Sequence, residues 1–309
     1  MFISYNYLVS LAFILTTDVV VGLEIGDYPN ITDTNQCGIG RQSHLLNDQC
    51  FEWHKSNDLM SNVVNGRDVQ PGEYPYVVYI EIWVRLSKWG GIDSQNACTG
   101  SILNQHWILS AHCYSNLAGI DYYKVFAGTI DKSKLGTDYG VEEVILHPKF
   151  ERTPRNPYDV ALIRVKTPMV FNDGDNGYAY RQLNSICLPP IDHMVTEYEL
   201  ALIVGFGRIN DTYVNTDRLQ TGLVRISAQN LTDPNIINAY QYPYPGGAHL
   251  CFGDSGGPLL QYVNGRAVLI GVSIWGDTGE NICSPNHRVW TAFVKVSAVL
   301  DWIIENISK

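Results

Sequence analysis

The chain has no excess of basic residues, no metal-binding cysteine pattern and no apolar run long enough for a membrane helix. Its 309 residues hold 21 Lys and Arg against 31 Asp and Glu, a net charge of −10 without a basic cluster, which argues against nucleic acid. None of the seven cysteines stands in a Cys-x-x-Cys pair, so a zinc site is not expected. No stretch reaches the ~18 apolar residues of a membrane helix. We therefore expect no metal, no cofactor, no nucleic acid and no membrane partner.

The first residues also lack Lys or Arg, yet they contain an apolar run at 7–15 followed by small residues up to Gly22. That run is too short to span a bilayer and predicts a secretory signal peptide over 1–22, with an end defined only to within several residues. The polar segment 23–62 has no sustained periodicity and is interpreted as a propeptide. The remaining 63–309 suffices for a single β-rich domain. A secreted, extracellular protein is expected, and its four Asn-x-Ser/Thr sequons make it a candidate glycoprotein.

The most informative feature that is present is the run Gly253-Asp254-Ser255-Gly256-Gly257-Pro258. A serine becomes a nucleophile only with a base beside it and with donors aimed at the charge it creates on a carbonyl. Because glycine has no Cβ, the chain can turn sharply here and direct the amides of Gly253 and Ser255 to one point. This predicts an oxyanion hole beside Ser255, although a lone Gly-x-Ser-x-Gly is about as often an ordinary turn.

Two further residues complete a catalytic triad. His112 closes the mostly apolar stretch 107–113, whose burial would hold the ring rigidly. Asp159 stands at the start of a short β-branched run that is typical of a buried strand, and a buried carboxylate needs a partner. The chain order His112, Asp159, Ser255 is one of three known arrangements of such a triad.

From about residue 63 onward the chain resembles the chymotrypsin-like (trypsin-fold) serine endopeptidases. Besides the triad segments, the blocks that carry this resemblance are Val63-Val64-Asn65-Gly66, Cys98-Thr99-Gly100-Ser101, Ile186-Cys187-Leu188-Pro189, Gly205-Phe206-Gly207, Trp275-Gly276 and Asp301-Trp302-Ile303. The resemblance implies an all-β fold of two antiparallel six-stranded β-barrels, with His112 and Asp159 in the first and Ser255 in the second. The i, i+3, i+4 spacing of Leu300, Ile303 and Ile304 predicts a short C-terminal helix over 299–304.

The implied activity is that of a serine-type endopeptidase. Its expected partners are polypeptide substrates and an activating protease, and protein inhibitors are a further candidate class. A second hypothesis is a catalytically impaired homologue that uses the same scaffold as a protein-binding module. Three departures from the family pattern motivate it. The block Ser110-Ala111-His112 is one residue short, Ile274 stands where a serine normally supports the triad Asp, and only two of the usual internal disulfides are evident.

By the same resemblance, the enzyme is made as a zymogen and is activated by a cut between Asn62 and Val63. The new ammonium of Val63 would enter the protein and pair with the buried Asp254, which would order the oxyanion hole. Many relatives carry Arg or Lys before the cut, and this chain carries Asn62. A trypsin-like activator is therefore not expected to cut here.

The substrate pocket implied by the resemblance has His249 at its floor, where trypsin-like enzymes carry Asp. Specificity for Arg or Lys is therefore not expected, because the pocket floor offers no negative charge to pair with a basic side chain. A neutral His249 favours an apolar or aromatic side chain, whereas a protonated one would accept an acidic side chain. Burial disfavours protonation, so the apolar pocket is preferred. The other residues assigned to the pocket are Leu250, Phe252, Trp275, Gly276 and Thr291.

The cysteine pairing is likewise implied by the resemblance. Cys98 is expected to pair with Cys113, and Cys251 with Cys283. Cys187 would anchor a propeptide cysteine, for which Cys37 and Cys50 are both candidates, and the sequence does not choose between them.

Overall fold

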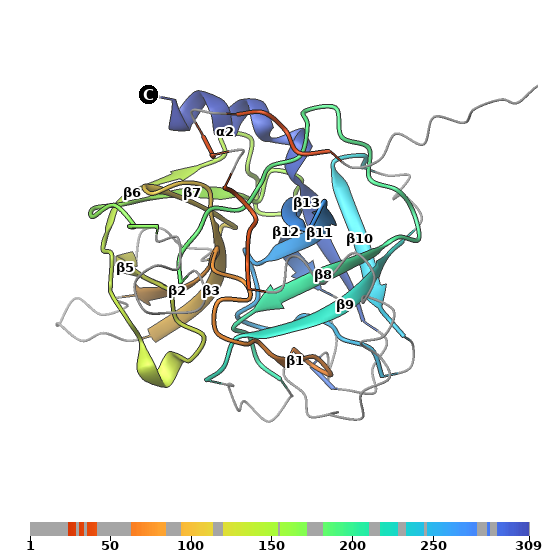
Figure 1. The fold of residues 1–309 in the computed structure, drawn as a ribbon, viewed down its shortest axis with the longest axis horizontal. Coiled ribbons are helices and arrows are strands. Elements are labelled where there is room, and N and C mark those ends of the chain that lie inside the picture. The colour runs from red at the N-terminus through yellow and green to blue at the C-terminus, as the bar shows by residue number, and fades with distance from the viewer. Residues whose placement is uncertain are drawn as a thin grey trace, which may run out of the picture.

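The structure is a computed structural model. It describes residues 24–28, 31–33, 36–41, 63–84, 94–113, 120–153, 155–171, 182–209, 217–227, 233–243, 246–276, 283–284 and 289–308. Strands dominate this part of the chain, and they form two antiparallel sheets that lie side by side (Figure 1). Within the same residues, no helix is long and apolar enough to cross a membrane.

The first sheet contains six strands in the order β5-β2-β3-β4-β7-β6. They are β2 (Val77–Val84), β3 (Ser94–Ile102), β4 (Trp107–Ser110), β5 (Ile120–Ala127), β6 (Val141–Leu146) and β7 (Ala161–Val165). Val and Ile fill β2, and nearly all of its residues are buried, as expected for β-branched side chains that pack on a pleated surface.

The second sheet has the order β1-β9-β10-β13-β12-β11-β8, and an additional pairing of β8 with β9 closes six of these strands into a barrel. The predicted all-β fold of two antiparallel six-stranded units is thus confirmed, with the second barrel closed and the first one open between β5 and β6 in the described residues. The strands are β1 (Arg67–Asp68), β8 (Leu200–Gly205), β9 (Gln220–Ile226), β10 (Ile236–Gln241), β11 (Pro258–Val263), β12 (Arg266–Gly276) and β13 (Trp290–Lys295).

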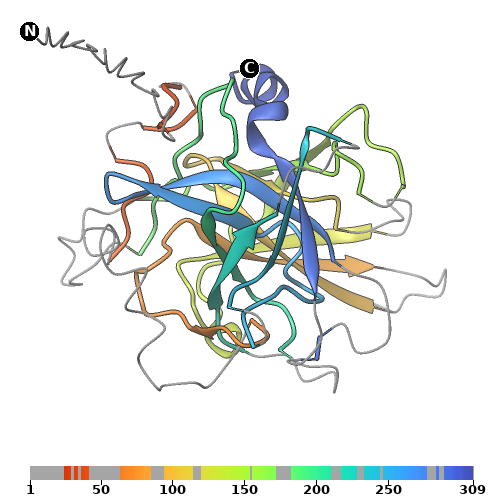
Figure 2. The ribbon, with the colours of Figure 1, turned by 90° about the vertical axis from the view of Figure 1, so that its right-hand side faces the viewer.

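The described helices are short. Two 3₁₀ turns, η3 (Lys132–Lys134) and η4 (Val296–Ala298), precede the C-terminal helix α2 (Leu300–Ile307). The predicted helix is thus confirmed, and it begins one residue later and ends three residues later than expected. Figures 1 and 2 both place α2 at one edge of the molecule. The Trp302 ring lies 5.0 Å from that of His147, just beyond β6, so the helix that follows the second sheet contacts the first.

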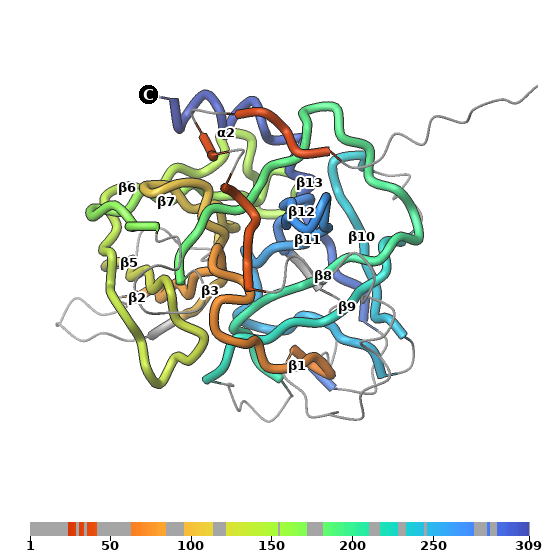
Figure 3. Tube along the Cα trace, viewed as in Figure 1, coloured from red at the N-terminus to blue at the C-terminus, as the bar shows by residue number. Residues whose placement is uncertain are grey.

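The described residues within 24–41 pack against the second barrel, and Figure 3 shows their red trace crossing the front of the molecule. The Gly38 N–H donates to the Ser185 carbonyl at 2.8 Å, and the Gly38 carbonyl accepts from the Ala267 N–H at 2.9 Å. A Cβ on Gly38 would lie 2.4 Å from the Ala267 oxygen, and its φ is +70°, so glycine is required for this close approach.

Candidate active site

The pairing of β4 with β7 places His112 opposite Asp159. Ser110 faces Ala161 in this antiparallel ladder. Continuing the same register for two residues beyond the strand ends sets His112 across from Asp159. The two residues are joined there, because the His112 main-chain N–H donates to Asp159 Oδ1 at 2.8 Å.

The serine loop packs against the end of β4. A Cβ on Gly256, whose φ is +80°, would lie 2.1 Å from Ser110 Oγ and 2.3 Å from the Thr99 carbonyl oxygen. The Thr99 N–H also donates to the Ser255 carbonyl at 2.9 Å, which ties the loop to β3. Glycine at 256 thus lets a loop of the second barrel approach the residues that lead to His112 in the first. Ser255 itself remains partly exposed.

The imidazole of His112 lies against Phe150, with ring centroids 4.3 Å apart. Its Nε2 atom is buried and has no hydrogen-bond partner in the described part of the chain. Burial lowers the pKa of His112, and the positive charge of Arg152 lowers it further. The imidazole is therefore kept neutral, as a general base must be before it accepts a proton.

The pKa of Asp159 is raised, whereas that of His112 is lowered. Burial raises its pKa to about 7, against the weaker effect of the His112 N–H, which lowers it. Among the described hydrogen bonds, none joins the Asp159 carboxylate to the His112 ring, or that ring to Ser255. The His112 ring packs on Phe150, and its described link to Asp159 is the main-chain hydrogen bond alone.

The amides of Gly253 and Ser255 donate to no other group of the described residues, while those of Asp254, Gly256 and Gly257 are all bonded. Gly253 has φ of +100°, and its carbonyl accepts from Thr99 Oγ1 at 3.2 Å. The predicted oxyanion hole needs two amides without an acceptor of their own, and these two meet that requirement within the described residues.

Asp254 is buried, at 1% exposure, and no cation contacts it in the described residues. Its Oδ1 accepts from the Gly207 N–H at 2.7 Å and its Oδ2 from the Cys251 N–H at 2.9 Å. Burial raises its pKa to about 6, and these two bonds, together with Lys132, oppose the rise. Lys132 Nζ donates to the Phe206 carbonyl at 3.0 Å. This carbonyl belongs to the same peptide group as the Gly207 N–H that donates to Asp254.

Val63 and Val64 are buried beside the predicted pocket floor. Val64 forms an antiparallel bridge with His249, whose N–H donates to the Val64 carbonyl at 3.1 Å. Val63 belongs to the same apolar cluster as Ala248 and Leu250. Asn62, the predicted residue before the cut, lies outside the described residues.

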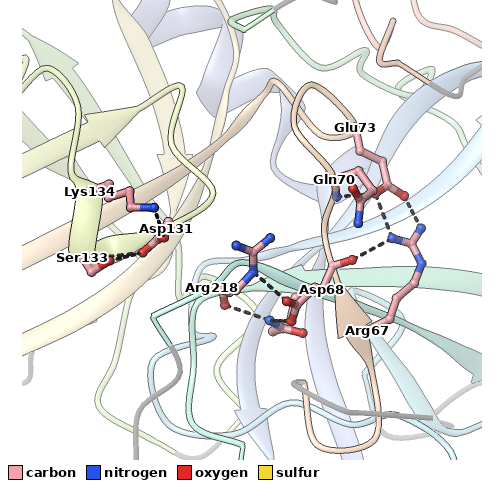
Figure 4. A network of polar contacts seen from close by, with 9 residues as sticks. Arg67, Asp68, Gln70, Glu73, Asp131, Ser133, Lys134 and Arg218 are labelled. Carbon is pink, nitrogen blue, oxygen red and sulfur yellow. Dashed lines mark hydrogen bonds and ion pairs between the residues drawn. The ribbon is translucent and has the colours of Figure 1, made fainter. Parts of the chain in front are cut away.

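Figure 4 shows the polar network that holds the chain just after this segment. Arg67 forms an ion pair with Glu73, and Arg218 Nε lies 2.6 Å from Asp68 Oδ2. Since Arg67 and Asp68 form β1 on the edge of the second sheet, the ion pairs anchor the chain within a few residues of Val63.

The predicted pocket residues are placed as follows. His249 is buried with Nδ1 2.7 Å from Gln241 Nε2. Leu250 and Thr291 are buried, and Thr291 faces Gly276 in the β12–β13 pairing. Phe252 is 58% exposed, and the side chain of Trp275 lies outside the described residues.

The predicted disulfides Cys98–Cys113 and Cys251–Cys283 are present. The partner of Cys187 is Cys37, and Cys50 lies outside the described residues. Cys37 meets Cys187 because the Gly38 segment runs along Ala267, next to the bridge between Cys187 and Val268.

Sequence reasoning did not find Phe150, Gln241 or Lys132 as neighbours of the site. None of the three stands in a motif, so spacing alone gives no signal for them. Ile274, which stands where the family carries a supporting serine, is buried, and the Ser273 carbonyl accepts from the Gly256 N–H at 2.7 Å.

Comparison with known proteins agrees with the fold. The sequence model of the Trypsin family matches residues 63–303. The chain therefore belongs to this family, the chymotrypsin-like serine proteases.

Three relatives are similar over most of this chain. Human "Transmembrane protease serine 5" is 27% identical over 87% of the chain and 56% of its own length. Bovine "Coagulation factor XI" is 26% identical over 80% of the chain and 38% of its own length. The Drosophila melanogaster "Serine proteinase stubble" is 26% identical over 80% of the chain and 31% of its own length. The chain thus spans about half or less of each of these relatives.

Proposed function

We propose that the chain is a secreted serine endopeptidase that is made as an inactive precursor. In this proposal, residues 1–22 are a signal peptide, 23–62 a propeptide and 63–309 the protease domain. The observation that carries the proposal is the β4–β7 register, which brings His112 to Asp159 while the loop of Ser255 packs on the end of β4.

The proposed chemistry is acyl transfer from a peptide to water. Ser255 attacks the carbonyl, His112 takes its proton and later gives it to the leaving amine, and the amides of Gly253 and Ser255 stabilise the oxyanion. Asp159 orients the imidazole and stabilises its charged form. For this the His112 ring must turn from Phe150 into the space between Ser255 and Asp159, a side-chain rotation that leaves the backbone bond to Asp159 unchanged.

Activation follows from the environment of Asp254. A cut between Asn62 and Val63 creates an ammonium at a residue that is already buried against the apolar cluster of the second barrel. Pairing with that ammonium would ionise Asp254, which burial otherwise disfavours. The ion pair would then hold the serine loop in its active arrangement.

The preferred residue before the scissile bond is proposed to be apolar. The floor residue His249 supplies no negative charge for Arg or Lys, and Leu250 and Thr291 are buried beside it. A basic side chain in this pocket would lose its hydration without gaining a counter-charge.

A serine-directed fluorophosphonate tests the catalytic assignment. Protein that starts at Val63 should be labelled at Ser255, and the Ser255→Ala variant, which lacks one hydroxyl, should fold normally and remain unlabelled. Labelling should also fall in His112→Ala, because the serine then has no base. Absence of labelling in folded, correctly cut protein would contradict the proposed activity and support the alternative of a catalytically impaired, protein-binding homologue.

A further inference from the structure

A buried glutamine and a buried histidine lie side by side behind the predicted pocket. Gln241 is the last residue of β10, His249 follows the turn after it, and each is 1% exposed. The Gln241 Nε2 atom lies 2.7 Å from His249 Nδ1. Because water does not reach this contact, one of the two atoms must donate and the other must accept.

A main-chain N–H just before β13 sets the orientation of the Gln241 amide. The β10–β13 pairing places Ala239 opposite Thr291 and Tyr240 opposite Trp290, so Gln241 reaches the residue just before β13. There the Val289 N–H donates to Gln241 Oε1 at 3.3 Å. Since a main-chain N–H can only donate, the amide oxygen faces Val289 and the NH₂ group faces the imidazole.

The amide orientation in turn fixes where His249 carries its hydrogen. The NH₂ group can only donate, so Nδ1 accepts and carries no hydrogen, and the hydrogen of the neutral ring lies on Nε2. Protonating Nδ1 would set its N–H against the amide NH₂. Turning the amide over would instead set the NH₂ against the Val289 N–H. Either change leaves two buried donors facing each other.

Two other described residues near the pocket floor have contacts that the structure defines. Val64, on the segment that begins at Val63, forms a main-chain bridge with His249, whose N–H donates to the Val64 carbonyl. Asp254, the ionisable residue of the serine loop, directs both carboxylate oxygens to the amides of Gly207 and Cys251. The role of Nδ1 follows from its 2.7 Å contact with the Gln241 amide.

We propose that Gln241 is a specificity-determining positioning residue, which holds His249 as the neutral Nε2–H tautomer and so keeps the pocket floor uncharged. The inference rests on the proposed function, in which His249 forms that floor. An uncharged floor offers no cation to an acidic side chain and no anion to a basic one, and it thereby selects apolar side chains. This selection holds even at the acidic pH where a solvated histidine becomes charged.

Two substitutions of Gln241 test the effect on specificity. Gln241→Glu keeps the size and the acceptor for Val289, but its carboxylate accepts from Nδ1–H and favours the charged ring. We expect the ratio of cleavage after Glu to cleavage after Phe to rise about tenfold or more between about pH 8 and pH 5.5 in this variant, and to change less than about twofold in the natural enzyme.

Matched variants separate charge from shape. Gln241→Met removes the hydrogen bond without adding a carboxylate, and its ratio should rise less than that of Gln241→Glu. Adding His249→Ala to Gln241→Glu should abolish the rise. A rise with falling pH in the natural enzyme, or an unchanged ratio in Gln241→Glu, would refute the role of Gln241.

A second measurement does not depend on catalysis or on the folding of any Gln241 variant. In ¹⁵N-histidine-labelled precursor carrying Ser255→Ala, the ring signals of His249 are identified by their loss in His249→Ala. They should show a protonated Nε2 and an unprotonated Nδ1 from about pH 8 to pH 6. An Nδ1–H tautomer, or a charged ring in this range, would overturn the inference. If the tautomer is as expected but no protease activity exists, only the proposed function fails.

Discussion

Replacing Asp159 by Asn should stabilise the fold while it removes catalysis. Burial raises the pKa of Asp159 from 3.8 to about 7. At pH values below 3.8 the carboxyl is protonated in both the folded and the unfolded chain, and it makes no difference to stability. Above that value the unfolded chain releases the proton while the folded chain keeps it. The free energy of unfolding therefore falls until the pH passes about 7.

The size of the change in the free energy of unfolding follows from the pKa shift of Asp159. A rise from 3.8 to about 7, at about 1.4 kcal/mol per pKa unit, corresponds to about 4 kcal/mol lost at alkaline pH. Asp159 keeps partial access to solvent, and the amide NH₂ of Asn needs a partner of its own, so we expect a net gain of about 2 kcal/mol for Asp159→Asn. The Asn oxygen can still accept from the His112 N–H, so the backbone geometry is kept.

The assay is thermal unfolding followed by circular dichroism, with the uncut Ser255→Ala precursor as parent to prevent self-cleavage. At about pH 8 the Asp159→Asn variant should melt about 4–8 °C higher than the parent, and the two should converge near pH 4. The exposed Asp192→Asn is the matched control and should not move the melting temperature. In active protein the same Asp159→Asn change should lower kcat about 10⁴-fold, because an amide favours the wrong imidazole tautomer. A gain that does not vary with pH, or a loss of stability at pH 8, would refute the reasoning.

Three further predictions concern activation. Trypsin should fail to activate the natural precursor but should activate Asn62→Arg, as measured by fluorophosphonate labelling, and equal activation of both would place the cut elsewhere. After cutting before Val63, the propeptide should stay attached through Cys37 and separate only on reducing gels, whereas a Cys37→Ser variant should release it without reductant. Lys132→Met should destabilise the precursor near pH 8 more than near pH 5, because the positive charge of Lys132 lowers the raised pKa of Asp254. Equal losses of melting temperature at both pH values would mean that Lys132 acts through packing alone.

The strands and the C-terminal helix could be predicted because their signal is local. Runs of Val and Ile predict buried strands, and the spacing of Leu300 and Ile303 predicts one apolar helix face. The residues of the candidate triad could be named for a similar reason, since each stands in a short motif whose residue types suit one chemistry.

The contacts that tune the site could not be predicted, because they depend on register and on side-chain rotation. The choice of Cys37 over Cys50 follows from the path of one segment along Ala267, and nothing in the cysteine spacing encodes that path. The packing of His112 on Phe150 depends on a rotamer. The contact between Gln241 and His249 joins residues on either side of a turn, and only the β10–β13 register brings in Val289 to orient the amide.

Two carboxyl groups of the candidate site, the buried Asp254 and the partly buried Asp159, contact no cation among the described residues. Burial raises the pKa of Asp159 to about 7 and that of Asp254 to about 6, so each resists ionisation until a positive partner approaches. For Asp254 that partner would be the ammonium of Val63, and for Asp159 it would be the imidazolium that forms when His112 takes the serine proton. The same burial that destabilises the two charges in the precursor therefore strengthens each ion pair once it forms, because the surrounding protein screens the attraction less than water does. In the proposed function, the cut before Val63 and then the reaction itself would each supply the positive charge that one of these carboxyl groups lacks.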